Sequence, residues 1–240
     1  GTTGPHRVYT ILADPVEPWS TVPVSDRPDI EKCMAWTNAL EWACTQAEGE
    51  TTQDGVASRI AASINEARLS YGQSMNEGGC FMHSNLWEDP VCELSLFIRH
   101  LNNVDDTGHV NCVDCSNMVV SFSNLLGCNL WSIKMFGYFE TNPIVLIGSN
   151  EWTEQFFIMH AIAWDEGVGG SHDLVYDACL KYAESPQNSR QNPTLPVSIQ
   201  FSDESPSAPY VYRERLTPPG LLGYDRCDLD RTTKGRMRIE

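Results

Sequence analysis

Basic side chains and long apolar runs are both scarce in this chain of 240 residues. Sixteen Lys and Arg stand against 32 Asp and Glu, which gives a formal net charge of −16. Nucleic acid and anionic membrane surfaces each require a basic patch, so we expect neither as the main partner and interpret the acidic charge as an aid to solubility. No run approaches the roughly 20 apolar residues of a membrane span, so no such span is predicted.

Internal repeats and low-complexity tracts are also absent from the sequence. The first residues, Gly1 to Pro5, lack the charged and apolar regions of a signal peptide, although processing removes such segments. Cysteine, by contrast, is abundant: there are nine, an odd number, and most lie inside predicted helices or strands. We interpret them as mainly reduced and buried, which favours a cytoplasmic setting and leaves secretion as an effector open.

Length and composition predict one large globular domain. Hydrophobic residues make up 41% of the chain and seven are tryptophan, enough for a substantial core. Prolines interrupt the chain repeatedly from residue 185 onward. We therefore predict a domain over residues 1–184 and a Pro-rich C-terminal extension, 185–240, packed on the same domain, with an extra strand at 210–216 and a mobile end from Thr232.

Helical patterns precede strand patterns along the chain. Helices are predicted at 28–47, at 51–71 and from Asp89 onward, and short strands at 7–12 and around 80–82. Two further strands are predicted at 130–136 and 143–147. This order is typical of an α+β fold.

The rest of the chain is organised around the stretch from Val110 to Gly127. Apolar side chains recur there at helical spacing, at Cys115, Val119, Phe122 and Leu126. The stripe predicts a helix that faces the core and ends at Gly127. Cys112 then falls in its first turn, near the positive end of the helix dipole and close to unpaired backbone N–H groups. Both features favour a thiolate, the nucleophilic form of cysteine.

Two later segments supply a base and a group to orient it. His160 lies at the centre of an apolar strand predicted at 156–164, and Asp177 lies in the middle of a second predicted strand, 173–180. Three glycines between them favour a hairpin loop, so the strands are expected to be antiparallel neighbours with His160 and Asp177 side by side. A histidine partner would also offset the cost of burying the Asp177 carboxylate.

The order Cys, His, Asp resembles the transglutaminase-like branch of the papain-like cysteine enzymes. The family's nucleophile motif, G-x-C-x-D-x-A, precedes a hydrophobic helix that ends in Leu-Gly. The matching positions here are Cys112, Asp114, Ser116, Leu126 and Gly127. The histidine strand of the family is matched by His160 to Trp164, and its aspartate by Asp177. The resemblance covers residues 105–180 and departs from the family at Ser116, where alanine is common, and at the flanking Asn111 and Cys115.

The resemblance implies an α+β, papain-like core, with N-terminal helices and the nucleophile helix packed on an antiparallel sheet. It implies acyl transfer on amide or peptide bonds of a protein or peptide substrate, of transglutaminase, deamidase or cysteine-peptidase type. Cys112 would form the thioester, His160 would move the proton and Asp177 would orient the imidazole. No metal or other cofactor is expected.

Stabilisation of the oxyanion requires hydrogen-bond donors, and the backbone N–H of Cys112 is the first candidate. A second donor is expected from an upstream segment, with Asn111 and the loop 73–87 as candidates. Trp164 is a further candidate for substrate contact. Asp114 is interpreted as a structural hydrogen-bonding group of the first helical turn.

Several alternatives remain open for these residues. Cys112 and Cys115 also form a C-x-x-C pair, which occurs in thioredoxin-like redox sites and in structural zinc sites, where His109, His160 or Cys179 would complete the ligand set. A papain-like scaffold that binds a partner without turnover is a third alternative. Among the other histidines, His172 lies beside the predicted Asp177 strand and is the alternative base.

Overall fold

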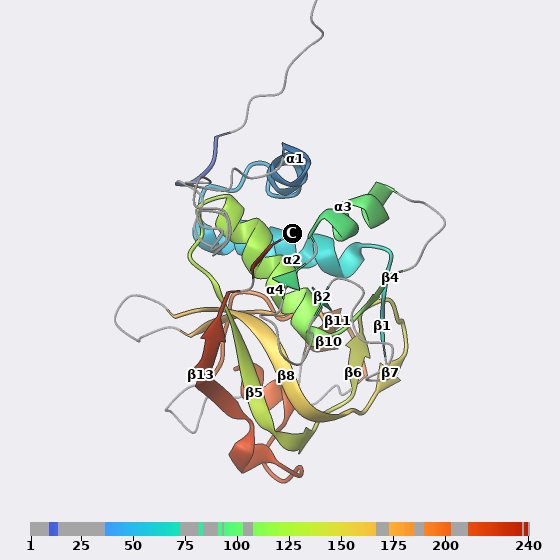
Figure 1. Cartoon of the computed structure of the whole chain (residues 1–240). Coiled ribbons are helices and arrows are strands. Elements are labelled where there is room, and N and C mark those ends of the chain that lie inside the picture. Colours follow the sequence, from blue (N-terminus) through green and yellow to red (C-terminus); the bar gives the residue numbers. More distant parts are fainter. Residues whose placement is uncertain are drawn as a thin grey trace, which may run out of the picture.

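The computed structural model describes residues 10–13, 37–72, 82–83, 91–92, 94–102, 108–166, 173–184, 190–202, 211–236 and 238–239. These residues form α-helices and mostly antiparallel sheets, so the predicted α+β class is confirmed. Figure 1 shows α1, α2 and α3 on one side, the long strands β5, β8 and β13 on the other, and α4 between them. No helix in these ranges has the length and apolar character needed to cross a membrane.

Five α-helices and one 3-10 helix lie in the described part of the chain: α1 (Thr37–Gln46), α2 (Gln53–Glu66), α3 (Leu94–Asn102), α4 (Cys112–Leu125), α5 (Tyr212–Leu216) and η1 (Tyr224–Arg226). α2 starts as predicted, because the Thr52 hydroxyl accepts a hydrogen bond from the Gly55 N–H. The prediction that it continues to Tyr71 is wrong, since the backbone turns extended at Ala67 and a strand follows. The first part of the helix predicted at 28–47 lies outside the described residues.

Three of the described strands, β5, β8 and β13, are long, and the others are short. The strands are β1 (Leu69–Tyr71), β2 (Met82–His83), β3 (Val91–Cys92), β4 (Gly108–Val110), β5 (Trp131–Glu140), β6 (Ile144–Leu146), β7 (Trp152–Thr153), β8 (Phe156–Asp165), β9 (Leu174–Tyr176), β10 (Leu180–Ala183), β11 (Pro193–Thr194), β12 (Ile199–Gln200), β13 (Asp228–Gly235) and β14 (Arg238–Ile239). β3 occupies part of the segment predicted to open α3, so that helix begins later, at Leu94. Residues 10–12 form no strand.

Two antiparallel sheets and two small ones organise these strands. The larger sheet has the order β12-β9-β8-β5-β13, and the second has the order β11-β10-β6-β7. β8 and β9 are antiparallel neighbours, with Trp164 opposite Val175, as the predicted hairpin requires. β1 pairs in parallel with β4, Tyr71 opposite Val110, and β3 joins β2 and β14.

Helix α4 is buried along its whole length rather than on one face. Every residue from Cys112 to Leu125 is buried, because α1 and α2 cover one side and β8 and β5 the other. A helix with almost no charge suits such a position. Ala161 and Ala163 of β8 belong to the same core cluster as α4, and small side chains there let the helix approach the sheet closely.

The C-terminal extension completes the larger sheet. Strand β13 pairs with β5, with Leu229 opposite Met135. The strand predicted at 210–216 is wrong, since Tyr212–Leu216 forms the short helix α5. At the end of the chain, β13 runs to Gly235 and β14 pairs with β3.

Gly148 sets how closely the second sheet approaches β1. It lies in the turn after β6 with a φ of +78°, and a Cβ there would stand 2.1 Å from the Leu69 carbonyl oxygen.

We expect Gly148→Ala to lower the urea midpoint of unfolding much more than Gly49→Ala. Gly49 shares the left-handed conformation, with φ +89°, but a Cβ added there would have no heavy atom within 4 Å. Gly49→Ala should therefore cost only about 1–2 kcal/mol. Equal losses in the two variants would contradict this explanation.

Candidate active site

Cys112 is the first residue of α4, directly after the cap that Asn111 provides. The Asn111 side-chain oxygen accepts hydrogen bonds from the N–H groups of Val113 (2.8 Å) and Asp114 (3.0 Å). The Asp114 carboxylate in turn accepts from the Asn111 N–H at 2.9 Å, which completes a capping box. The cap uses both of these amides, whereas the Cys112 N–H has no hydrogen-bond partner in the described structure.

His160 and Asp177 form a buried hydrogen-bonded pair. His160 Nε2 lies 2.8 Å from Asp177 Oδ2, and the two side chains are 0% and 1% exposed. Asp177 also accepts from the Tyr212 hydroxyl at 2.8 Å, on the same oxygen, and from the Cys179 N–H at 2.7 Å, on the other. Three donors thus compensate the desolvation of this carboxylate.

Asp177 does not lie in the middle of a strand, as the sequence predicted. β9 ends at Tyr176 and β10 begins at Leu180, in the other sheet. The contact between the Asp177 carboxylate and the N–H two residues later is the arrangement of an Asx turn. This turn, together with a backbone hydrogen bond from the Asp177 N–H to Pro196 O at 2.7 Å, moves the chain from one sheet to the next.

The second ring nitrogen of His160, Nδ1, is available to interact with Cys112. Nε2 is occupied by Asp177, and the buried Nδ1 has no hydrogen-bond partner among the described residues. Burial lowers the pKa of His160, but the Asp177 carboxylate and its hydrogen bond, followed by the Cys112 thiol, raise it more, to about 10. The Phe157 ring stacks on the imidazole with centroids 4.9 Å apart. The imidazole is therefore held in place and disposed to carry a positive charge.

Two further thiols, Cys115 and Cys179, interact electrostatically with Cys112 and are fully buried. They interact with each other: the contact with Cys179 lowers the pKa of Cys115, whereas burial and the Asp114 charge raise it, with a net increase. Burial raises the pKa of Cys179 well above its ordinary value. Both should stay protonated near neutral pH. The seven described cysteines are all buried, as predicted.

The other predicted site residues have structural contacts. Trp164 is fully buried, and its indole N–H donates to Asp173 at 3.0 Å, so these contacts give it a packing role. Asn111 serves as the helix cap. Ser116, the departure from the family motif, is buried and lies 2.8 Å from the Ser132 hydroxyl, which ties α4 to β5. The loop 73–87, apart from 82–83, and His172 lie outside the described residues.

Sequence reasoning missed Tyr212, which is 35 residues from Asp177 and belongs to the C-terminal extension. Its segment has alternating character and was predicted to be a strand. Nothing in a single sequence indicates that a phenol this distant reaches the carboxylate, because the contact depends on how α5 packs beneath β10.

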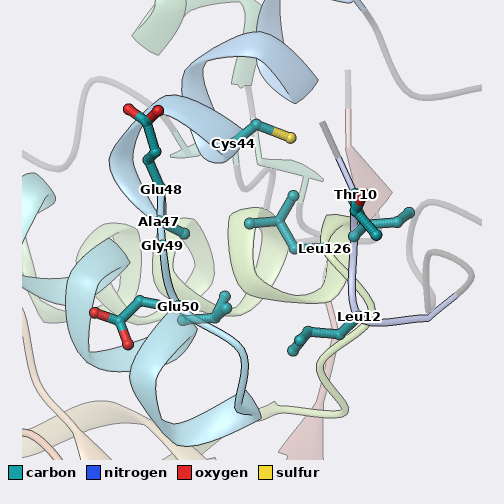
Figure 2. Close-up of a pocket in the computed structure, with 10 residues that line it drawn as sticks. Thr10, Leu12, Cys44, Ala47, Glu48, Gly49, Glu50 and Leu126 are labelled. Carbon is teal, nitrogen blue, oxygen red and sulfur yellow. The ribbon is translucent and has the colours of Figure 1, made fainter. Parts of the chain in front are cut away.

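One pocket lies away from these residues. It has a volume of about 400 Å³ and is lined by Leu12, Cys44, Glu48, Glu50 and Leu126, among others, as Figure 2 shows. Leu126 caps the C-terminal end of α4, so a 14-residue helix of about 20 Å separates this pocket from Cys112. Across the described ranges, no three His, Cys, Asp or Glu side chains are grouped to hold a metal ion.

The raised pKa of His160 makes stability depend on pH. Between the ordinary value of 6.5 and about 10, the folded state holds a proton that the unfolded state has lost, so the free energy of unfolding falls as pH rises. In Cys112→Ala, where no thiolate can form beside the imidazole, we expect urea unfolding to show this decline between pH 6.5 and about 7.5, and a flatter profile when His160→Gln is added. Staying more than one pH unit below the ordinary cysteine pKa of 9.0 keeps most unfolded thiols protonated, so that their contribution is small. Equal slopes would contradict the prediction.

No protein-family model matches the sequence, and the search of curated proteins gave no match. The functional evidence therefore comes from three residues of the chain. These are Cys112 at a capped helix start, the buried His160 with one unpaired ring nitrogen, and Asp177, whose carboxylate has three hydrogen-bond donors.

Proposed function

We propose that this protein is a thiol-dependent acyl-transfer enzyme, similar to transglutaminase-like enzymes with a papain-like core, that acts on amide or peptide bonds. The observation that carries the proposal is the 2.8 Å hydrogen bond between His160 Nε2 and Asp177 Oδ2, which leaves the buried Nδ1 for Cys112. A purely structural buried histidine is expected to have both nitrogens satisfied. An unsatisfied nitrogen next to a thiol is what a proton-transfer site requires.

In the first half of the proposed reaction, His160 Nδ1 takes the Cys112 proton and gives a thiolate–imidazolium pair. The sulfur attacks the carbonyl carbon of the substrate, and the C=O electron pair moves to oxygen. When the tetrahedral intermediate collapses, the C–N bond breaks and Nδ1 returns the proton to the departing ammonia or amine. Asp177 keeps the Nε2 proton in place and stabilises the imidazolium throughout.

In the second half, a nucleophile releases the acyl group from the thioester. His160 Nδ1 removes a proton from water or from an amine, the new C–O or C–N bond forms, and the C–S bond breaks. Water gives hydrolysis or deamidation, and an amine gives cross-linking. The Cys112 N–H, which the Asn111 cap leaves free, is the first donor to the oxyanion.

A catalytically silent scaffold of the same fold is the second candidate. The observation in its favour is the small exposure of Cys112, only 4%, because a nucleophile must be reached by its substrate. The two candidates differ in whether the thiol reacts.

The proposal predicts that Cys112 is alkylated by iodoacetamide at about pH 6, where an ordinary thiol with a pKa near 8.5 is almost fully protonated. Labelling is read site by site by mass spectrometry. His160→Ala should slow labelling at Cys112 by about tenfold or more, because the imidazolium that stabilises the thiolate is gone.

Cys115 and Cys128 are comparison sites in the same molecule, because burial and neighbouring groups raise their pKa. Labelling of Cys112 no faster than at these two sites, or unchanged by His160→Ala, would remove the enzyme proposal and leave the silent scaffold.

A further inference from the structure

A row of backbone hydrogen bonds connects the two halves of the candidate site through strand β1. The Ile147 N–H donates to Cys179 O at 2.8 Å, the Tyr71 N–H donates to Ile147 O at 3.1 Å, and the Gly72 N–H donates to Val110 O at 2.9 Å. The row begins at Cys179, two residues after Asp177, and ends at Val110, two residues before Cys112. Tyr71 therefore lies in the middle of the row, between Ile147 and Val110.

The Tyr71 side chain is directed toward this site. Successive side chains of a strand alternate: Leu69 is buried in the core, whereas Ser70 contacts the exposed His109, with 2.9 Å between Oγ and Nδ1. Tyr71 thus shares the inner face with Leu69, and it packs against both core clusters. Burial, followed by the charges of Cys179, Cys112, Cys115 and Asp177, raises the pKa of Tyr71, so the phenol interacts with the groups of this site and keeps its proton.

The hydroxyl of Tyr71 is unpaired within the described residues, and the residue borders a pocket. It has no hydrogen bond within the described part of the chain, unlike Tyr176, which donates to Asp54, and Tyr212, which donates to Asp177. Tyr71 is partly exposed and lines a pocket of about 230 Å³ between β1 and the turn after β6, with Ser70 and Ser149 also in the wall. A phenol O–H that the fold has fixed in place but not paired is available to a ligand.

We propose that Tyr71 is a catalytic residue of this site, whose hydroxyl supplies the second hydrogen bond to the oxyanion that forms on attack by Cys112. The inference rests on the proposed function. As the thiolate sulfur bonds to the carbonyl carbon, the oxygen gains a full negative charge, and a preorganised donor is worth more to that oxyanion than to the neutral carbonyl. The Cys112 N–H is the other donor. Tyr71 lies just before the upstream loop in which the sequence suggested a donor.

Two reagents separate this role from general reactivity of the thiol. p-Nitrophenyl acetate acylates Cys112 through a tetrahedral oxyanion: a C–S bond forms, the ester C–O bond breaks and p-nitrophenolate leaves. Iodoacetamide alkylates the same sulfur by direct displacement of iodide and forms no oxyanion. We expect Tyr71→Phe to slow acylation of Cys112 by at least about tenfold and to leave its alkylation within about twofold, because only the first reaction uses an oxyanion donor.

Tyr138→Phe is the matched control, because this tyrosine is 55% exposed and lies on β5 outside the site; both of its rates should equal those of the wild type. If Tyr71→Phe leaves acylation unchanged, or slows both reactions equally, Tyr71 is not an oxyanion donor while the proposed function stands. If Cys112 of the wild type reacts with neither reagent near neutral pH, the proposed function itself fails. Phenylalanine preserves the ring that packs between the two clusters, so the fold should persist.

Discussion

A buried carboxylate is costly unless several donors compensate the water it has lost, and the architecture around the site meets this requirement at Asp177. The three donors are the imidazole of His160, the phenol of Tyr212 and the N–H of Cys179. They come from β8, from α5 and from the turn between the two antiparallel sheets. The geometry of the imidazole therefore depends on how these separate parts pack, and so does the direction in which its free nitrogen points.

The features that the sequence predicted correctly are coded by neighbouring residues. Helix α4 follows from apolar spacing and from an Asn-to-Asp capping box within four residues. The pairing of β8 with β9 follows from two apolar runs around a glycine-rich loop. Together these local signals sufficed to predict the pairing of His160 with Asp177 without any information on the rest of the fold.

What the sequence did not predict depends on contacts between distant segments. Strands of two or three residues, such as β1 and β4, are too short to show a period, and β1 exists because it pairs with a segment 39 residues away. Asp177 interrupts a run of residues that alternates like a single strand, because its carboxylate accepts a hydrogen bond from the N–H of Cys179. The sequence predicts a strand at α5, because a segment of five polar and apolar residues is too short to distinguish the helical period of 3.6 from the strand period of 2.

The participation of Tyr212 has a consequence for biosynthesis. A ribosome makes the chain from its N-terminus at about 5–20 residues per second, so Cys112, His160 and Asp177 are all joined before Tyr212 is added, and β13 follows later still. During that interval the nascent chain holds the three residues of the site without the last donor to its carboxylate and without an edge strand of its larger sheet. Assembly of the candidate site is therefore a late event, completed by the C-terminal extension.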